Sequence, residues 1–255
     1  QFTISFIYLR SLKNYLNLCM MKNILVIIPT FNESENISQI IYSVFKHVPQ
    51  CHILVVDDNS PDGTSRIVKK IINLTKKRLF IKDRKNKLGL GAAYIDGFNW
   101  AIEKKYDFIF EMDADFSHDP VSLPKMIEIL KDNSDVVVGS RYKQGVNVVN
   151  WPLGRILLSY AASLYVRVIT GMPIKDPTAG YVGYKREVLE KIELDKIQFV
   201  GYAFQIEMKY KSWIKGYKIH EYPIVFKNRI NGKSKMDQSI FWEALIGVIK
   251  MRLLN

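Results

Sequence analysis

Short apolar runs alternate with helical patterns through the first half of the chain. Runs such as 24–28 and 53–56, which end at proline or aspartate, are typical of strands buried on both faces of a parallel sheet. Between them, apolar residues recur at three- and four-residue spacing, which predicts amphipathic helices over 37–45 and 67–72. The same pattern continues with strands at 79–81, 108–112 and 136–138 and with helices at 91–103 and 121–130.

This alternation predicts the α/β class, with a sheet that helices cover on both faces. Sheets of this kind bind ligands beyond the carboxyl ends of their strands. The residues that follow the strands are therefore the candidates for chemistry, and they occupy 29–33, 57–62, 113–117 and 139–142.

The pattern changes after Tyr142. After it we expect an apolar helix at 155–170 and a strand at 176–184. A helix at 203–214 and a second strand at 219–226 follow, and then a basic loop at 227–236 and a closing helix at 238–254. The longest continuous apolar run, 156–166, lies between Arg155 and Arg167 and is shorter than the roughly 20 residues of a membrane-spanning helix.

The chain has 255 residues, 48% of them hydrophobic, and no linker-like stretch divides it, which favours one globular domain. We predict an extension over 1–21 outside the fold, a main domain over 22–236 and an amphipathic C-terminal helix over 237–255. Two cysteines, Cys19 and Cys51, indicate no disulfide framework, so a reducing compartment such as the cytoplasm is expected.

The formal net charge of +12 suits a nucleic acid, an anionic membrane or phosphorylated substrates as a partner. A nucleic-acid surface should interleave basic and aromatic residues, whereas the charges here are scattered over the predicted helices. Nucleic acid is therefore not a predicted partner.

The strongest chemical signal is the pair Asp113 and Asp115, directly after an apolar strand. Two carboxylates at a strand end can converge on Mg²⁺ or Mn²⁺, which prefer oxygen ligands and often take one or two carboxylates plus substrate phosphates. A polar turn that caps the next helix is the alternative, but two neighbouring anions repel each other unless a positive charge lies between them.

A second pair of acids, Asp57 and Asp58, ends the strand at 53–56. The residues that follow, 60–64, have the composition of a turn, and Asp62 or Thr64 could cap the next helix. Turn formation does not explain the two acids, which could accept hydrogen bonds from a nucleobase or a ribose.

Seven segments together resemble the inverting nucleotide-diphospho-sugar transferases of the GT-A fold, and within them the dolichyl-phosphate (polyprenol monophosphate) mannose synthases. In order they are 29–33 (PTFNE), 56–64 (VDDNSPDGT), 113–118 (DADFSH), 139–142 (GSRY), 150–155 (NWPLGR), 176–180 (DPTAG) and 232–236 (GKSKM). The resemblance extends over residues 22–245 and implies a mixed, mostly parallel sheet with helices on both faces.

The resemblance also implies roles for individual residues. Contacts to the donor nucleotide are expected from Pro29, Phe31, Glu33, Val56, Asp58, Asp113, Ala114, Asp115, Arg229 and Lys235, the last two in a loop that closes over the donor. The metal is expected at Asp113, Asp115 and Ser117, where some relatives have glutamine in place of the serine. The acceptor phosphate is expected to face Arg141, Arg155 and Ser159.

The implied reaction is the transfer of mannose from GDP-mannose to a polyprenyl phosphate, with inversion and with Asp113, Asp115, Arg141 and Arg155 as the catalytic residues. A glucosyltransferase that uses UDP-glucose and a GT-A transferase with a saccharide acceptor are the alternatives. Because much of a phosphomonoester is dianionic at neutral pH, its second pKa being about 6, we predict no general base. His118 is then a group that holds the metal loop.

A lipid acceptor implies peripheral attachment to the cytoplasmic face of a membrane, with or without a membrane subunit as a partner. The helix at 238–254 either lies at the membrane interface or packs on the core, and the helix at 155–170 is a second candidate for the interface. Lys87 is read as a surface charge.

Overall fold

The computed structural model describes residues 23–199, 201, 203–227 and 238–253. The predicted extension over 1–21 lies outside these residues, as do Arg229, Lys235 and nearly all of the predicted basic loop.

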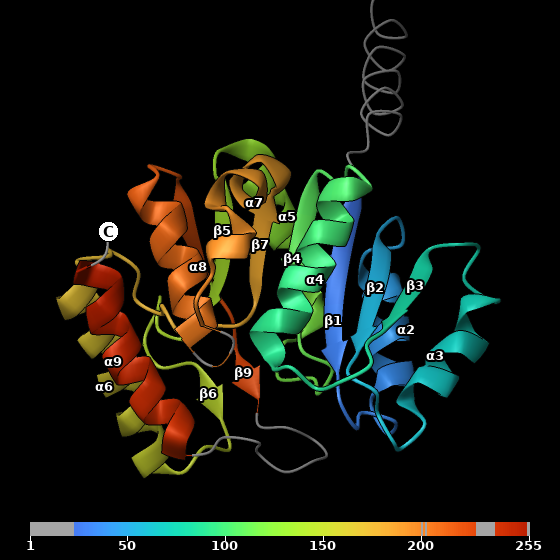
Figure 1. The fold of residues 1–255 in the computed structure, drawn as a ribbon, viewed down its shortest axis with the longest axis horizontal. Helices are drawn as coiled ribbons and strands as arrows, with labels where there is room; N and C mark the ends of the chain where they lie inside the picture. Colours follow the sequence, from blue (N-terminus) through green and yellow to red (C-terminus); the bar gives the residue numbers. More distant parts are fainter. Residues whose placement is uncertain (1–22, 200, 202, 228–237, 254–255) are drawn as a thin grey trace, which may run out of the picture.

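The centre of the molecule is a seven-stranded sheet in the order β3-β2-β1-β4-β7-β5-β8 (Figure 1). Its strands are β1 (Ile24–Thr30), β2 (His52–Asp57), β3 (Leu79–Asp83), β4 (Phe108–Glu111), β5 (Val136–Ser140), β7 (Val182–Lys185) and β8 (Ile219–Pro223). Only β7 runs antiparallel to its neighbours, β4 and β5. The sheet is therefore mixed and mostly parallel, as predicted.

Helices cover both faces because successive side chains of a strand point to opposite sides. In β1, Ile24, Val26 and Ile28 join one core cluster, whereas Leu25 and Ile27 join the other. The first cluster lies under α2 (Ile37–His47), α3 (Thr64–Ile72) and α5 (Leu123–Asp132), and the second under α4 (Leu90–Glu103), α7 (Arg186–Ile192) and α8 (Ala203–Ile214).

Helix α4 packs closely on β1 at Gly97. A Cβ atom at this position would lie 2.8 Å from a side-chain carbon of Ile27, closer than such atoms approach in practice. The glycine therefore allows α4 to pack closely against the sheet. From α4, the Tyr94 side chain reaches Asp113, which follows β4.

Three predicted elements differ in the structure. The helix predicted from residue 121 starts with a 3₁₀ turn, Pro120–Ser122, because Asp119 caps the backbone amide of Val121. The strand predicted over 176–184 begins only at Val182. The strand predicted over 219–226 is divided, and its second part, β9 (Phe226–Lys227), pairs with β6 (Val148–Val149) in a separate sheet.

Helices α6 (Leu153–Thr170) and α9 (Gln238–Leu253) lie side by side at one end of the molecule, next to α8 (Figure 1). Val166, Val248 and Met251 join them to α8 in a third apolar cluster. Among the described residues, α6 alone is long and apolar enough to cross a membrane by length and composition, and 17% of it is buried. The apolar run predicted over 156–166 is shorter than this helix because the run ends at Arg155 and Arg167, which the helix includes.

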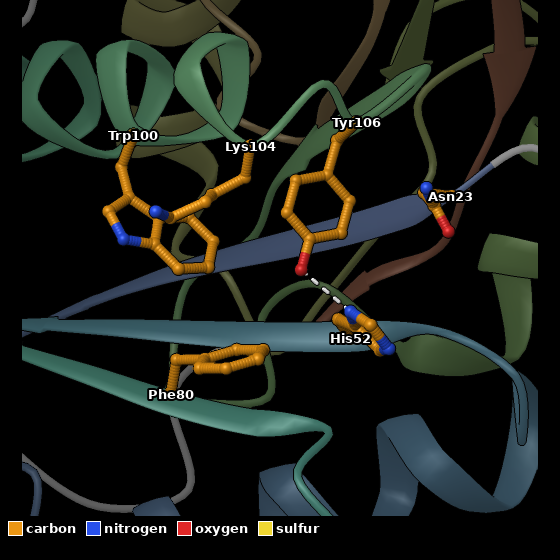
Figure 2. A pocket seen from close by; sticks show the side chains of 6 residues that line it. All are labelled: Asn23, His52, Phe80, Trp100, Lys104 and Tyr106. Atoms are coloured by element: carbon orange, nitrogen blue, oxygen red, sulfur yellow. Dashed lines mark hydrogen bonds between the residues drawn. The ribbon is translucent and has the colours of Figure 1, made fainter.

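A cavity of about 260 Å³ lies where the parallel strands begin. Its lining combines four rings with two polar side chains: His52, Phe80, Trp100, Tyr106, Asn23 and Lys104 (Figure 2). Parallel strands begin at one edge of a sheet and end at the other, so this cavity is remote from the predicted site residues that the structure describes.

Candidate active site

The loops that follow β1 and β2 are tied together by hydrogen bonds from the predicted turn. Asp57 accepts hydrogen bonds from the Thr30 hydroxyl at 2.7 Å and from the Ser60 hydroxyl at 2.6 Å. Asp62 accepts from the backbone amide of Ser34 and, at 2.6 Å, from the Thr64 hydroxyl. Asp57 and Asp62 therefore fix the shape of this edge. Of the two acids at the end of β2, Asp57 thus has a structural role that requires no ligand.

The second acid, Asp58, is held by Arg84, whose guanidinium nitrogen lies 2.8 Å from the carboxylate. Both side chains are nearly inaccessible to solvent. Burial raises the pKa of Asp58 above its ordinary value, although the charge of Arg84 opposes this change. Arg84 also approaches Asp96 of α4 at 3.8 Å. It therefore links α4 to the loops after β1 and β2, which are called the donor edge below because they carry the predicted donor contacts.

The other predicted donor residues differ in accessibility. The Phe31 ring is partly exposed, and the ammonium nitrogen of Lys87 lies 4.3 Å from its centroid. The interpretation of Lys87 as a plain surface charge missed this cation–π contact. Pro29 and Glu33 are also partly exposed, whereas Val56 is fully buried in the core. The Val56 side chain therefore belongs to the core.

The loop after β4 carries both predicted metal ligands and folds back on itself. The backbone amide of Asp113 donates to Nδ1 of His118 at 3.0 Å, and the amide of Ser117 donates to Asp115 at 3.1 Å. Because Nδ1 accepts a hydrogen bond, the proton of the neutral ring is on Nε2. The His118 ring stacks on Tyr181 with centroids 4.9 Å apart. This geometry agrees with the predicted role of His118 in holding the loop.

The donor set of this loop fits a divalent cation. Asp115 is buried, and the Ser117 hydroxyl is buried without a hydrogen-bond partner. Buried polar atoms usually have a partner, and a coordinated cation would satisfy this oxygen. Tyr94 donates to Asp113 at 3.3 Å. Within the described ranges no group of three His, Cys, Asp or Glu side chains converges. A metal here would therefore be held by the carboxylates of Asp113 and Asp115, the Ser117 hydroxyl and phosphate oxygens of a bound substrate.

On the acceptor side, Arg141 is buried and bound by Asp176. Its Nε and Nη2 atoms lie 2.8 and 2.6 Å from the two carboxylate oxygens, and Nη2 also donates to Thr178 at 2.7 Å. Burial alone would raise the pKa of Asp176, but the Arg141 guanidinium more than offsets this effect and the pKa is lowered. The charge of Arg141 is thus balanced by Asp176, which the sequence did not indicate.

Arg155 and Ser159 lie in the first turns of α6. The Arg155 guanidinium carbon is 4.0 Å from the centroid of the Trp151 ring, and that of Arg141 is 5.7 Å from the same centroid. Ser159 accepts a hydrogen bond at 2.8 Å from the hydroxyl of Tyr142, which is the residue next to Arg141. The structure therefore brings the three predicted acceptor groups together.

Comparison with known proteins identifies the family. The sequence profile described as glycosyl transferase family 2 matches residues 25–193, about two thirds of the chain. The chain belongs to glycosyl transferase family 2. It is a glycosyltransferase, as the sequence predicted.

Two relatives of this glycosyltransferase are similar over most of their length. The polyprenol monophosphomannose synthase of Mycolicibacterium smegmatis is 44% identical over 88% of this chain and 84% of the relative. The undecaprenyl-phosphate mannosyltransferase of Micrococcus luteus is 41% identical over 90% of this chain and 94% of the relative.

A solved structure shares the fold. Glucosyl-3-phosphoglycerate synthase of Mycobacterium tuberculosis, crystallised with Mn²⁺, uridine diphosphate and its product, superposes with a TM-score of 0.62 at 19% identity, over 92% of this chain and 80% of the other. At this identity the likeness shows the GT-A fold alone, and it confirms the predicted fold class.

Sequence reasoning missed a buried polar group behind the site of this glycosyltransferase. Lys209 of α8 is inaccessible to solvent, and its ammonium donates to Ala179 O, Gln205 O and Gln205 Oε1 at 2.6, 2.9 and 3.2 Å. Gln205 also donates to Glu111, the last residue of β4. Burial lowers the pKa of Lys209 to about 8, although the charge of Glu111 opposes this. Polar residues on a helix gave no signal of this role.

Proposed function

We propose that the chain transfers mannose from GDP-mannose to a polyprenyl phosphate, with inversion at the anomeric carbon and with Mg²⁺ or Mn²⁺. The names of the two relatives support the sugar and the class of acceptor. One observation carries the proposal. His118 of the carboxylate loop and Arg141 both contact the Phe226 ring, with the His118 ring centroid at 5.8 Å and the Arg141 guanidinium carbon at 5.6 Å. The groups for a metal-bound diphosphate and for a phosphate acceptor thus lie side by side.

In this proposal the metal would be held by Asp113, Asp115 and Ser117. When bound, it neutralises charge on the diphosphate that leaves. The donor nucleotide would lie along the loops after β1 and β2, against Phe31, Glu33 and Asp58, with the backbone of Pro29, Val56 and Ala114. Arg229 and Lys235, outside the described residues, remain proposed donor contacts.

Arg155 would bind the acceptor phosphate, because a planar guanidinium matches two phosphate oxygens. A phosphate oxygen then forms the bond to the anomeric carbon as the bond to the GDP oxygen breaks. No proton has to be removed from a phosphate dianion, so no general base is needed. His118 fits this view because Nδ1 accepts from a backbone amide and Nε2 carries the proton.

Peripheral attachment to the cytoplasmic face of a membrane is part of the proposal. On α6, Leu153, Leu157 and Val168 expose 70, 61 and 71% of their surface. Clustered exposure of large apolar side chains marks interaction surfaces, and the net charge of +12 favours anionic lipid. A membrane subunit that covers α6 would use the same residues.

Flotation with anionic liposomes tests this attachment. The variant Leu157→Ser with Val168→Ser should lose most of its liposome binding. Leu74→Ser, which changes a residue that is 74% exposed and follows α3, at the end of the molecule away from α6 (Figure 1), should bind as the wild type does. Unchanged flotation of the α6 variant would refute the attachment.

A donor panel tests the reaction. The protein is incubated with a short polyprenyl phosphate, Mg²⁺ or Mn²⁺ and either GDP-mannose, UDP-glucose or UDP-galactose, and lipid-linked sugar is measured. Mannose should be the sugar transferred. Glucose transfer from UDP-glucose would favour the glucosyltransferase instead, and transfer only to a saccharide acceptor would refute the proposed acceptor class.

A further inference from the structure

Trp151 lies between the two arginines of the proposed acceptor site. Its ring centroid is 4.0 Å from the guanidinium carbon of Arg155 and 5.7 Å from that of Arg141. At 4.0 Å the contact with Arg155 is close, well within the range of a cation–π interaction. The indole thus contacts Arg155 directly and also approaches Arg141.

The fold fixes the indole from behind. Val148 of β6 is three residues before Trp151. The parallel pairing of β6 with β9 places Val148 opposite Phe226. The Phe226 ring meets the indole edge-on, with centroids 5.3 Å apart and an interplanar angle of 77°. After Trp151 the chain enters α6 through Pro152, so the backbone on either side of the indole is also restrained.

Stacking suits an arginine that must bind phosphate. A guanidinium that lies over an aromatic face uses its π surface, and the N–H groups along its edges stay available for two phosphate oxygens. Arg155 is exposed and has a long, flexible side chain, so without a platform it would lose more conformational entropy on binding. Its place in the first turn of α6 also puts the bound anion at the positive end of the helix dipole.

We propose that Trp151 is a positioning residue that acts through Arg155: its indole face holds the guanidinium ready for the acceptor phosphate, beside Arg141. This inference rests on the proposed function. Trp151 itself forms no bond with the reacting atoms, so its effect should be on acceptor binding and should depend on the presence of Arg155.

The test is a double-mutant cycle with separate KM values for donor and acceptor. Trp151→Leu should raise the KM for polyprenyl phosphate about three- to tenfold, the factor that a cation–π contact of this kind provides. The KM for GDP-mannose should not change. Trp151→Phe keeps an aromatic face and should retain most of the wild-type affinity. In an Arg155→Ala background, Trp151→Leu should add nothing.

Trp100→Leu is the matched control, because Trp100 lies at the remote cavity where the strands begin (Figure 2). It should change neither KM, and thermal denaturation of each variant checks the fold. An equal effect of Trp151→Leu with and without Arg155, or a Trp151→Phe variant as poor as Trp151→Leu, would overturn the inference. If Arg155→Ala itself leaves the acceptor KM unchanged, the proposed acceptor site is wrong, whatever Trp151 does.

Discussion

The buried ion pair between Arg141 and Asp176 makes a strong prediction for stability. Asp176 is inaccessible to solvent and binds Arg141 through both carboxylate oxygens. Asp176→Asn leaves a buried cation without its counter-charge, and removal of one partner of such a pair typically costs about 3–5 kcal/mol. For a chain of this size that corresponds to a fall in Tm of about 6–20 °C.

Asp83→Asn is the matched control. Asp83 pairs with Lys69 at 2.6 Å, but the two side chains are 45 and 56% exposed. Exposed ion pairs contribute about 0–1 kcal/mol, so this variant should unfold nearly as the wild type does. The assays are thermal denaturation, which gives the Tm, and urea denaturation, which gives the free energy of unfolding, both followed by circular dichroism at pH 7.5.

The pH dependence gives a second measure of the same pair. The pKa of Asp176 is lower in the folded state than its ordinary value of 3.8. The ion pair therefore stabilises the protein fully above pH 3.8, and this contribution is lost as the pH falls through the folded-state pKa. The difference in unfolding free energy between wild type and Asp176→Asn should shrink below pH 3.8. Equal, small effects of Asp176→Asn and Asp83→Asn at pH 7.5 would refute the reasoning.

Three further predictions concern the carboxylate loop, the donor edge and the core. His118→Ala should keep measurable turnover, because the ring only holds the loop, whereas Asp115→Ala should lose nearly all of it; equal collapse of two folded variants would contradict this ranking. Arg84→Ala, which releases Asp58, should raise the KM for GDP-mannose about tenfold, the value of one charge-assisted hydrogen bond, while Lys82→Ala, which loses a more exposed ion pair two residues earlier, in β3, should leave it unchanged; equal KM values would count against the assignment of the donor edge. Burial raises the pKa of Cys51 to about 12, so iodoacetamide at pH 8 should label this thiol far more slowly in the native than in the urea-unfolded protein, as peptide mass spectrometry would show; equal rates would exclude its burial.

The strand ends were predictable because buried parallel strands are nearly continuous apolar runs. The pattern locates β1, β2 and β4 and so places Asp58, Asp113 and Asp115 at one edge of the sheet. The family motifs then added the acceptor residues. Helix α7 was not predicted, because its apolar residues Val188, Leu189 and Ile192 have helical spacing over only seven residues, which is less than two turns.

The contacts between motifs could not be predicted, because they depend on tertiary structure. Arg141 and Asp176 are 35 residues apart and meet only because β7 is inserted between β4 and β5. Trp151 meets Phe226 because two strands of two residues each pair in parallel, and strands this short have no recognisable alternation. Asp57 and Asp58 have the same side chain, and only their neighbours separate a structural role from a candidate binding role.

The central claim is that the acids after β4 and the arginines near Trp151 together serve one metal-dependent transfer to a lipid phosphate. Its most direct test is the amount of lipid-linked mannose formed from GDP-mannose and a polyprenyl phosphate, before and after chelation by EDTA. The product should form, EDTA should abolish its formation, and added Mn²⁺ or Mg²⁺ should restore it. Formation of the product at an unchanged rate in EDTA would contradict the account.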